Sequence, residues 1–302
     1  MFDIIGDIHG HADALEILLQ KLNYVRMNGV YTHPENRKVL FVGDFIDRGP
    51  KIRETLHIVK DMYDAGNAIA IMGNHEFNAI CFHTLRKNLG GYYRNHSIKE
   101  IEQHLETIRQ FKYFPSEWKM FLNWFKQLPL FFENEDFGAV HACWVPSHIQ
   151  WIKENYNGIT EDFLELATSK ANTGGAYKVI EDTLKGTESA LPSGRTFVDK
   201  DGTLRKECRI RWWNDIRERE KYGQFLFDCP KDLEYESIPD DADFYFYNEP
   251  KKVFFGHYWL KGIPTENNAN AICLDYSVAK GGILVACRTE KHDTVLKMSF
   301  VF

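Results

Sequence analysis

The sequence predicts an α/β fold with parallel strands in its first third. Three apolar runs there each end in a glycine followed by a short polar residue, at Gly6, Gly43 and Gly73. The steps of 37 and 30 residues between these glycines are typical of βαβ units. The runs are continuous and rich in β-branched residues, which indicates strands buried on both faces. The segments between them have the apolar spacing of helices.

This pattern defines the first elements in chain order. Three strands are expected, at residues 2–5, 39–42 and 68–72. Helices are expected between these strands, at residues 12–22 and 52–63. After the strands, residues 76–128 are mostly helical in pattern, with a helix expected at residues 97–111. Ser116 is expected to cap a further helix, which Leu128 and Pro129 end.

A second group of apolar runs predicts a second, more mixed sheet. Their hairpin-like spacing differs from the βαβ spacing of the first third. The runs lie at residues 130–133, 138–143, 252–255, 271–274, 283–288 and 295–302. The predicted fold class is therefore α/β, in part α+β, within a single domain of residues 1–302.

A long insertion, residues 148–250, separates the strands of this second group. Residues 151–185 have a helical pattern with a break at Gly174-Gly175, whereas the acidic stretch 231–249 is expected to be a solvated loop. The insertion is too long to be a plain loop. We expect a cap over the functional edge of the sheets.

Composition and charge exclude several classes of protein. The net charge is −6, which disfavours stable binding to nucleic acid or to an anionic membrane. No apolar run approaches the length that spans a bilayer, and the first residues do not have the pattern of a signal peptide. The six cysteines are widely spaced, which predicts free thiols in a reducing cytoplasm rather than a zinc site.

Polar side chains follow each strand of the first third. Asp7, Asp44 and Asn74 each come directly after a glycine at a predicted strand end. The carboxyl ends of parallel strands form the binding edge of a sheet. His9 lies two residues after Asp7, so in extended backbone both side chains point to the same side. Carboxylate, imidazole and amide ligands together suit manganese, iron or zinc.

The motifs around these residues resemble a known family. The chain contains GDIHG (6–10), GDFIDRGP (43–50), GNHE (73–76), WFKQLPLFFE (124–133), HA (141–142), FGH (255–257) and LDYSVAKGGILVA (274–286). In order and spacing they resemble the phosphoprotein phosphatase group of calcineurin-like metallophosphoesterases. The resemblance implies two packed mixed β-sheets flanked by helices, with two divalent metal ions at one edge. Manganese is the expected metal, with iron or zinc as alternatives.

The resemblance also implies roles for individual residues. The metal ligands would be Asp7 and His9 on the first ion, Asp44 between both ions, and Asn74, His141 and His257 on the second. A bridging carboxylate holds two cations about 3.5–4 Å apart and prepares a shared water for attack on phosphorus.

Three further residues would serve the substrate. Arg48 would hold the phosphate, since a guanidinium matches phosphate oxygens. His75 would protonate the leaving oxygen, and Asp47 would orient it.

Some features depart from the family pattern. Trp259 stands where the wider superfamily often has a second histidine, Cys143 replaces a usual glycine, and LDYS replaces an LDTG-like stretch at residues 274–277. The group uses a second phosphate-binding arginine, for which Arg211 in RIRWWND (209–215) is the first choice and Arg209 the reserve. Trp212 and Trp213 are expected in the core.

The predicted function is a two-metal phosphoesterase. The first expectation is a serine/threonine protein phosphatase, and the alternative is a hydrolase of dinucleoside polyphosphates or other nucleotides; the shared motifs do not decide between them. A metal-binding scaffold or a nuclease is disfavoured, the scaffold because Asp47, Arg48 and His75 are all present. The remaining histidines are expected to be surface or structural residues, with His11 left open: His11, His33, His57, His83, His96, His104, His148 and His292.

Overall fold

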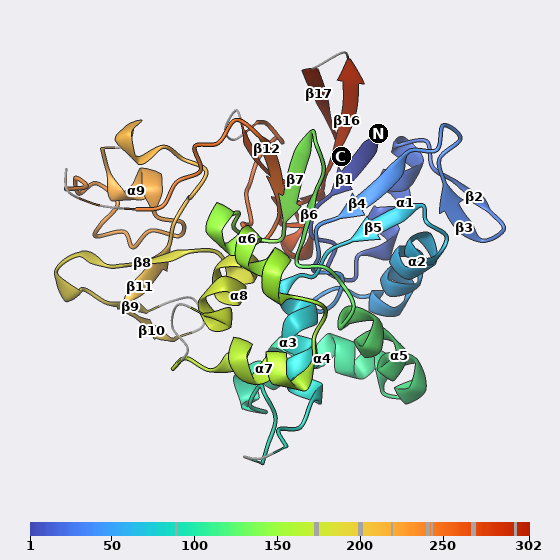
Figure 1. The fold of residues 1–302 in the computed structure, drawn as a ribbon, viewed down its shortest axis with the longest axis horizontal. Coiled ribbons are helices and arrows are strands. Elements are labelled where there is room, and N and C mark those ends of the chain that lie inside the picture. The colour runs from blue at the N-terminus through green and yellow to red at the C-terminus, as the bar shows by residue number, and fades with distance from the viewer. Residues whose placement is uncertain are drawn as a thin grey trace.

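The computed structural model describes residues 1–87, 90–171, 175–198, 202–218, 220–239, 242, 244–266, 270–292 and 295–302. Two β-sheets form its centre, with helices α1 to α5 on one side together with α7 and α8 of the insertion, and the rest of the insertion on the other (Figure 1). The predicted α/β class and the two flanked sheets are confirmed. The predicted break at Gly174 lies outside the described residues.

The first sheet has the order β17-β16-β1-β4-β5. Strands β1 (Phe2–Ile5), β4 (Lys38–Phe41) and β5 (Ala68–Ala70) are parallel, as the βαβ spacing predicts. Strands β16 (Ala286–His292) and β17 (Val295–Val301) form an antiparallel hairpin beside β1. The carboxyl ends of the three parallel strands therefore meet at one edge.

The second sheet has the order β13-β12-β7-β6 and is mixed, as predicted, but the assignment of runs 283–288 and 295–302 to it is wrong, because β16 and β17 extend the first sheet beside β1. Strands β7 (Phe137–Val140), β12 (Lys252–Phe255) and β13 (Ala271–Cys273) are parallel, and β6 (Phe131–Glu133) is antiparallel to β7. The predicted strand 138–143 ends earlier than expected. His141 lies one residue beyond β7, where its side chain can turn toward the sheet edge.

The two sheets pack face to face through one apolar cluster. Ile4 and Leu40 from the first sheet and Phe137, Phe254 and Ile272 from the second are fully buried within it. Burial of such side chains contributes about 1.5–3 kcal/mol each. This packing fixes the two sheet edges relative to each other.

Helices cover the outer face of the first sheet. They are α1 (Ala12–Lys21), α2 (Ile52–Asp64), α3 (Asn74–His83), α4 (Ile98–Phe111) and α5 (Pro115–Phe125). The prediction that Ser116 caps the last of these is wrong, because Phe114 is the N-cap and Pro115 occupies the first turn. Proline is favoured there since its missing N–H would make no helical bond.

The insertion packs on both layers: buried apolar side chains of residues 161–185 join the cluster of the first-sheet helices, and those that follow, from Leu191 to Tyr247, pack on the outer face of the second sheet. Its helices are α6 (Pro146–Asn155), α7 (Glu161–Thr168), α8 (Ala176–Lys185) and α9 (Tyr222–Phe225). Its strand pairs are β8 (Glu188–Ala190) with β11 (Glu207–Arg209), and β9 (Phe197–Val198) with β10 (Leu204–Arg205). Trp212 and Trp213 are buried, so their assignment to the core is confirmed.

Two short hairpins complete the sheet structure of the described residues. They are β2 (Val25–Met27) with β3 (Val30–Thr32), which the sequence did not predict, and β14 (Asp275–Tyr276) with β15 (Ile283–Leu284). All six cysteines are free, and five of them are buried. The predicted free thiols are therefore confirmed.

Candidate active site

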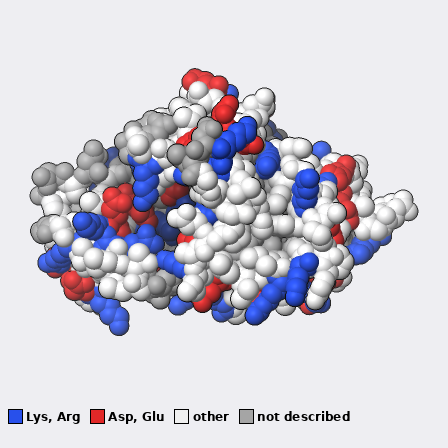
Figure 2. Space-filling view, turned by 90° about the horizontal axis from the view of Figure 1, so that it is seen from below, with Lys and Arg blue, Asp and Glu red and all other residues white. Residues whose placement is uncertain are grey.

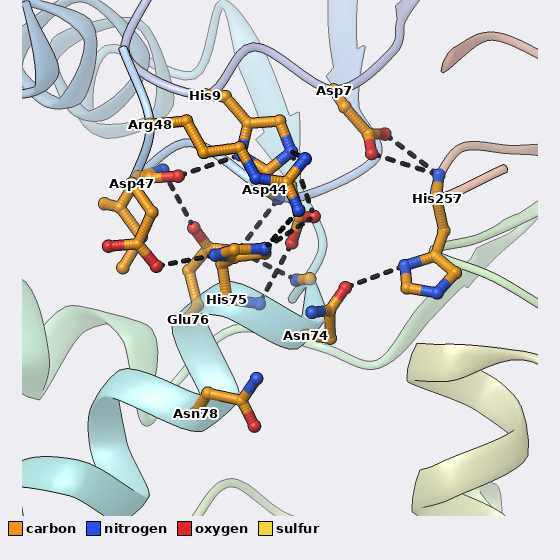
Figure 3. A network of polar contacts seen from close by, with 12 residues as sticks. Asp7, His9, Asp44, Asp47, Arg48, Asn74, His75, Glu76, Asn78 and His257 are labelled. Carbon is orange, nitrogen blue, oxygen red and sulfur yellow. Dashed lines mark hydrogen bonds and ion pairs between the residues drawn. The ribbon is translucent and has the colours of Figure 1, made fainter. Parts of the chain in front are cut away.

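Five chain segments bring the predicted metal ligands to one edge of the two sheets. The ligands follow β1, β4 and β5 in the first sheet and β7 and β12 in the second. Figure 3 shows Asp7, His9, Asp44, Asn74 and His257 gathered at this edge. Segments more than 200 residues apart thus meet here, because the carboxyl ends of both sets of parallel strands lie on the same side.

Asp44 is the centre of this group. It belongs to two sets of possible metal ligands, one with His9 and His75 and one with His141 and His257. His9 Nε2 lies 3.5 Å from Asp44 Oδ2, and His141 Nε2 lies 3.4 Å from Asp44 Oδ1. The two carboxylate oxygens therefore face two different sets of donors, which is the arrangement that a bridging ligand requires.

The ring nitrogens of these histidines are arranged for metal binding. His9 Nδ1 lies 2.9 Å from the Ile46 carbonyl, and His141 Nδ1 lies 2.8 Å from the Val42 carbonyl. A carbonyl only accepts, so both Nδ1 atoms carry a proton, and Nε2 is the atom of each ring that can bind a metal ion once it is deprotonated.

Asn74 joins the second set through its side-chain oxygen. Asn74 Oδ1 lies 3.0 Å from His141 Nε2 and 2.8 Å from His257 Nδ1. His257 Nε2 is buried and has no hydrogen-bond partner among the described residues. The amide oxygen and both rings therefore converge on one point, as ligands of a single ion would.

Asp7 lies on the His257 side of this centre. Its carboxylate accepts the backbone N–H of His257, at 3.0 Å from Oδ2 and 3.2 Å from Oδ1 (Figure 3). The first of the two His and Asp sets contains His75 where the sequence analysis expected Asp7.

The buried carboxylates of the site repel one another. Burial, and then the charges of Asp275 and Asp44, raise the pKa of Asp7 well above its usual value. Burial alone would lower the pKa of His141, but the charge of Asp44 outweighs it and raises that pKa to about 10. This edge therefore attracts positive charge, and its donor set fits divalent cations.

The backbone around the site is strained. Five of the expected site residues have positive φ: His9, Asp44, Asp47, Arg48 and His257. Such conformations cost about 1–3 kcal/mol each for residues other than glycine and gather at functional sites. At Gly256 a Cβ atom would lie 1.9 Å from Asp7 Oδ1, so only glycine allows this close approach.

Glu76 supports the loop that carries Asp44, a role that the sequence analysis did not assign. Its carboxylate accepts the backbone N–H groups of Gly73, Asp44 and Phe45 at 3.1, 2.9 and 2.8 Å. Burial, and then the charge of Asp44, raise the pKa of Glu76 to about 7. The position of Glu76 in the GNHE motif was the available signal.

His75, Asp47 and Arg48 form a second group beside the metal edge. His75 Nδ1 lies 2.5 Å from Asp47 Oδ2, while Arg48 approaches His75 Nε2 at 3.2 Å and His9 Nε2 at 3.1 Å (Figure 3). Burial alone would raise the pKa of Asp47, but hydrogen bonds from His104 and His75 hold it well below its usual value. Asp47 is therefore ionised and can orient a neighbouring imidazole.

A cavity of about 700 Å³ opens onto both groups. Arg48, His75 and His257 line one side, and residues of the insertion, including Arg209 and Phe227, line the other. The charged side chains of its lining carry both signs. The same mixture of signs is visible on the face shown in Figure 2.

The structure places the two arginines of RIRWWND differently. Arg209 lines the cavity, and its Nε is buried without a hydrogen-bond partner among the described residues. Arg211 is absent from the cavity lining, and its Nε donates to the Leu226 carbonyl at 3.3 Å. Arg209, the reserve candidate, is thus the arginine that reaches the cavity beside the expected metal ligands, rather than Arg211, the first choice.

Several residues near the site were missed or left open in the sequence analysis. His104 lies 2.7 Å from Asp47, although it was grouped with the surface or structural histidines. Asp275 is buried close enough to Asp7 to raise its pKa. His11 is the N-cap of α1 and belongs to neither set of possible metal ligands.

Comparison with known proteins shows which family this chain resembles. A family model described as calcineurin-like phosphoesterase matches residues 1–258. The asymmetrical bis(5'-nucleosyl)-tetraphosphatase PrpE of Halalkalibacterium halodurans is 37% identical over 116 residues, which are 37% of this chain and 47% of that protein. The symmetrical bis(5'-nucleosyl)-tetraphosphatase of Marinomonas sp. is 26% identical over 300 residues, which are 95% of this chain and 93% of that protein.

The matched regions and the solved structures complete this comparison. The chain matches less than half of the length of its PrpE relatives from Halalkalibacterium halodurans, Bacillus subtilis and Oceanobacillus iheyensis. A solved serine/threonine phosphatase from Saccharomyces cerevisiae is 17% identical, covers 99% of this chain and 78% of its own, and has a TM-score of 0.48. Among the described residues, none of the helices is both long enough and apolar enough to cross a membrane.

Proposed function

Because the chain belongs to the calcineurin-like phosphoesterase family, we propose that it hydrolyses phosphate esters with two divalent cations held around Asp44. The observation that carries this proposal is the membership of Asp44 in both sets of His and Asp donors. The ligands would be those expected from the sequence: Asp7, His9, Asp44, Asn74, His141 and His257. When bound, the cations would supply Lewis acidity and lower the pKa of a water molecule.

The donor set limits the choice of metal. Carboxylate, imidazole and amide donors without a thiolate suit manganese, iron and zinc. We propose manganese, with iron and zinc as alternatives.

The substrate would be held and protonated by side chains beside the metals. Arg48 would bind phosphate oxygens, and His75 would give a proton from Nε2 to the leaving oxygen while Asp47 holds Nδ1. We propose Arg209 rather than Arg211 as the second phosphate-binding arginine, because only Arg209 lines the cavity. A buried Nε without a partner is available to a phosphate oxygen.

The insertion would act as a cap within a single domain. Its strands β9, β10 and β11 contribute Phe197, Arg205 and Arg209 to the cavity lining, opposite the metal ligands. Such a cap would restrict which leaving groups reach His75. A cytoplasmic location is also proposed, because all six cysteines are free.

The proposed substrates are phosphoserine and phosphothreonine proteins. A second candidate class is the dinucleoside polyphosphates, because the relatives from Halalkalibacterium halodurans and Marinomonas sp. are bis(5'-nucleosyl)-tetraphosphatases. The cavity has aromatic side chains, Phe227 and Trp259, that could contact a nucleobase. Both classes need the same metals and the same proton donor.

A substrate screen tests this proposal. The protein is supplied with manganese and offered phosphopeptides, p-nitrophenyl phosphate and diadenosine polyphosphates, with phosphate release and chromatography as readouts. A chelator should abolish every activity. His75→Asn should lower turnover by roughly 10²–10⁴-fold on phosphoserine, whose alkoxide leaves poorly, and far less on p-nitrophenyl phosphate.

Two results would count against the proposal. Turnover that survives the chelator would contradict the metal-dependent reaction. Equal deficits of His75→Asn on good and poor leaving groups would mean that His75 positions the substrate or the metal instead.

A further inference from the structure

Helix α4 presents an unusual buried face. Its fully buried side chains are His104, Thr107 and Phe111, so two of the three are polar. A helix that packed only for stability would bury apolar residues at these positions. The two polar side chains are three residues apart and therefore lie on the same side of the helix.

Both polar side chains contact the same carboxylate. His104 Nδ1 lies 2.7 Å from Asp47 Oδ1, and the Thr107 hydroxyl donates to the same oxygen at 2.5 Å. The Asp47 backbone N–H in turn donates to Thr107 Oγ1 at 3.1 Å. Asp47 Oδ2 then faces His75 Nδ1, its one hydrogen-bond partner within the described part of the chain.

The donor and the acceptor can be assigned for the hydrogen bonds around Asp47. An ionised carboxylate only accepts, so His104 Nδ1 and His75 Nδ1 must both carry a proton. His104 Nε2 lies 3.1 Å from His83 Nε2. Burial, and then the charge of His104, lower the pKa of His83 to about 4, so His83 is neutral near pH 7 and can hydrogen-bond the far side of the His104 ring.

The loop that carries Asp47 needs such support. Asp47 and Arg48 have φ values of 66° and 69°, a conformation that is unfavourable for these residues. Gln110, three residues after Thr107 on α4, accepts the N–H of Ile52 at 2.6 Å and donates to the Gly49 carbonyl at 3.1 Å. One face of α4 therefore holds both the loop backbone and its carboxylate.

We propose that His104 and Thr107 are positioning residues, which hold the Asp47 carboxylate so that His75 is aligned with the leaving group. They act on the reaction only through Asp47 and His75, and this inference rests on the proposed function of His75 as proton donor. Their hydrogen bonds occupy Oδ1 and fix the carboxylate plane. Without them, the carboxylate could turn and the imidazole would lose its direction toward the substrate.

Paired substitutions separate this role from simple packing. Thr107→Val and His104→Leu remove the donors, whereas Thr107→Ser keeps the hydroxyl and His104→Asn keeps an N–H near the position of Nδ1. We expect the donor-removing variants to lose roughly 10- to 100-fold in kcat on a phosphoserine peptide, because small misplacements of catalytic groups cost this much. The loss on p-nitrophenyl phosphate should be below about 3-fold, KM should change little, and Thr107→Ser should recover most of the activity.

A double substitution provides the decisive comparison. Residues that act through one another are not additive, so His75→Asn combined with Thr107→Val should be no slower than His75→Asn alone. A matched control is His33→Asn, which alters another buried histidine whose ring packs against Tyr24, and it should leave the leaving-group dependence unchanged. Thermal melts confirm that each variant is folded.

Proton NMR tests the same hydrogen bonds without turnover. Two downfield Nδ1–H resonances are expected in the wild type, and both should be lost in Asp47→Asn. His104→Leu should remove one of them and shift the other.

Several outcomes would overturn the inference. They are equal losses on both leaving groups, additive effects with His75→Asn, the same defect in Thr107→Ser as in Thr107→Val, or an unshifted His75 resonance in His104→Leu. If the wild type hydrolyses no phosphate ester at all, the proposed function fails instead, while the NMR result still decides whether His104 and Thr107 hold Asp47.

Discussion

Strand β1 places two buried carboxylates only four residues apart, in opposite electrostatic surroundings. Asp3, within the strand, is 0% exposed and accepts hydrogen bonds from Arg37 Nη2 at 3.0 Å, Arg288 Nε at 2.8 Å and the Tyr24 hydroxyl at 3.1 Å. Asp7, just after the strand, is 3% exposed and lies close to the carboxylates of Asp44 and Asp275.

The pKa values of the two groups shift in opposite directions. Burial alone would raise the pKa of Asp3, but the hydrogen bonds and charges of Arg288 and Arg37 outweigh it and lower that pKa. At Asp7, burial is reinforced by neighbouring carboxylates, and the pKa rises well above its usual value. The chain therefore neutralises Asp3 with its own arginines and leaves Asp7 to a cation from outside.

This difference separates a structural cluster from a functional one. The arginines around Asp3 tie β1 to β16 and to the start of β4, and neither of them lines the cavity. Asp7 accepts two contacts from the backbone N–H of His257 instead of an arginine side chain, and its neighbour Asp44 sits on a backbone of positive φ. A buried charge left without an internal partner is a signal of ligand binding, whereas a buried charge with complete partners is a signal of stability.

The largest effect is expected at the metal edge. Asp44→Asn removes the charge shared by both donor sets, so the protein should lose bound metal and at least roughly 10³-fold in turnover, since metal ions contribute several kcal/mol to transition-state stabilisation. Elemental analysis and phosphate release measure the two quantities. A variant that keeps two metal ions and full activity would contradict the dinuclear site.

A substitution at Asp3 should have the opposite signature. Asp3→Asn leaves Arg37 and Arg288 without their shared anion, and breaking a buried ion pair costs about 3–5 kcal/mol of unfolding free energy. Urea denaturation measures this loss, while turnover per folded molecule should stay near that of the wild type. A large loss of turnover in fully folded protein would remove the distinction between the two clusters.

A surface ion pair provides the control for this experiment. Asp136 contacts Lys291 at 2.6 Å, and both side chains are partly exposed. Asp136→Asn should cost less than about 1 kcal/mol, because water screens such a pair. An equal cost at both aspartates would mean that burial of the Asp3 cluster adds nothing.

The sequence contains local signals for the expected metal ligands, but it contains none for the cluster of buried charges around Asp3. Four of the six expected metal ligands directly follow a glycine at a strand end, and all six lie within short motifs, so each signal is local. The partners of Asp3 come from Tyr24, Arg37 and Arg288, which only the sheet order β16-β1-β4 brings together. No local sequence pattern predicts these long-range contacts.

The same limit applies around the candidate site. Asp47 and His75 lie within motifs, but His104 and Thr107 come from a helix whose pattern shows only an ordinary polar and apolar alternation. Arg209 and Arg211 are two residues apart on one segment, and only the pairing of β11 with β8 decides which one meets the cavity. Long-range packing, not local propensity, sets these contacts.

The gain in unfolding free energy on metal binding should depend on Asp7 and not on Asp3. At a free metal concentration 100 times the dissociation constant, binding adds about 2.7 kcal/mol to the unfolding free energy. Wild type and Asp3→Asn should both gain this amount, whereas Asp7→Asn should gain much less. Thermal melts with manganese and with chelator measure the gain. An equal gain in Asp7→Asn would show that Asp7 is not a ligand.

The smallest effect is expected from acid, and it concerns Asp3. Because the folded pKa of Asp3 is lowered, its ionised form stabilises the fold. That contribution is fully present above the unfolded pKa, which is about 3.9, and it is lost as pH falls through the folded pKa. The gap in unfolding free energy between wild type and Asp3→Asn should therefore be constant from pH 7 to about pH 5 and shrink below about pH 4. Urea denaturation at each pH, with chelator present throughout, keeps metal release out of the comparison. A gap that stays constant down to pH 2 would mean that the stabilising role of Asp3 does not depend on its charge, and the contrast between the two ends of β1 would then rest on packing alone.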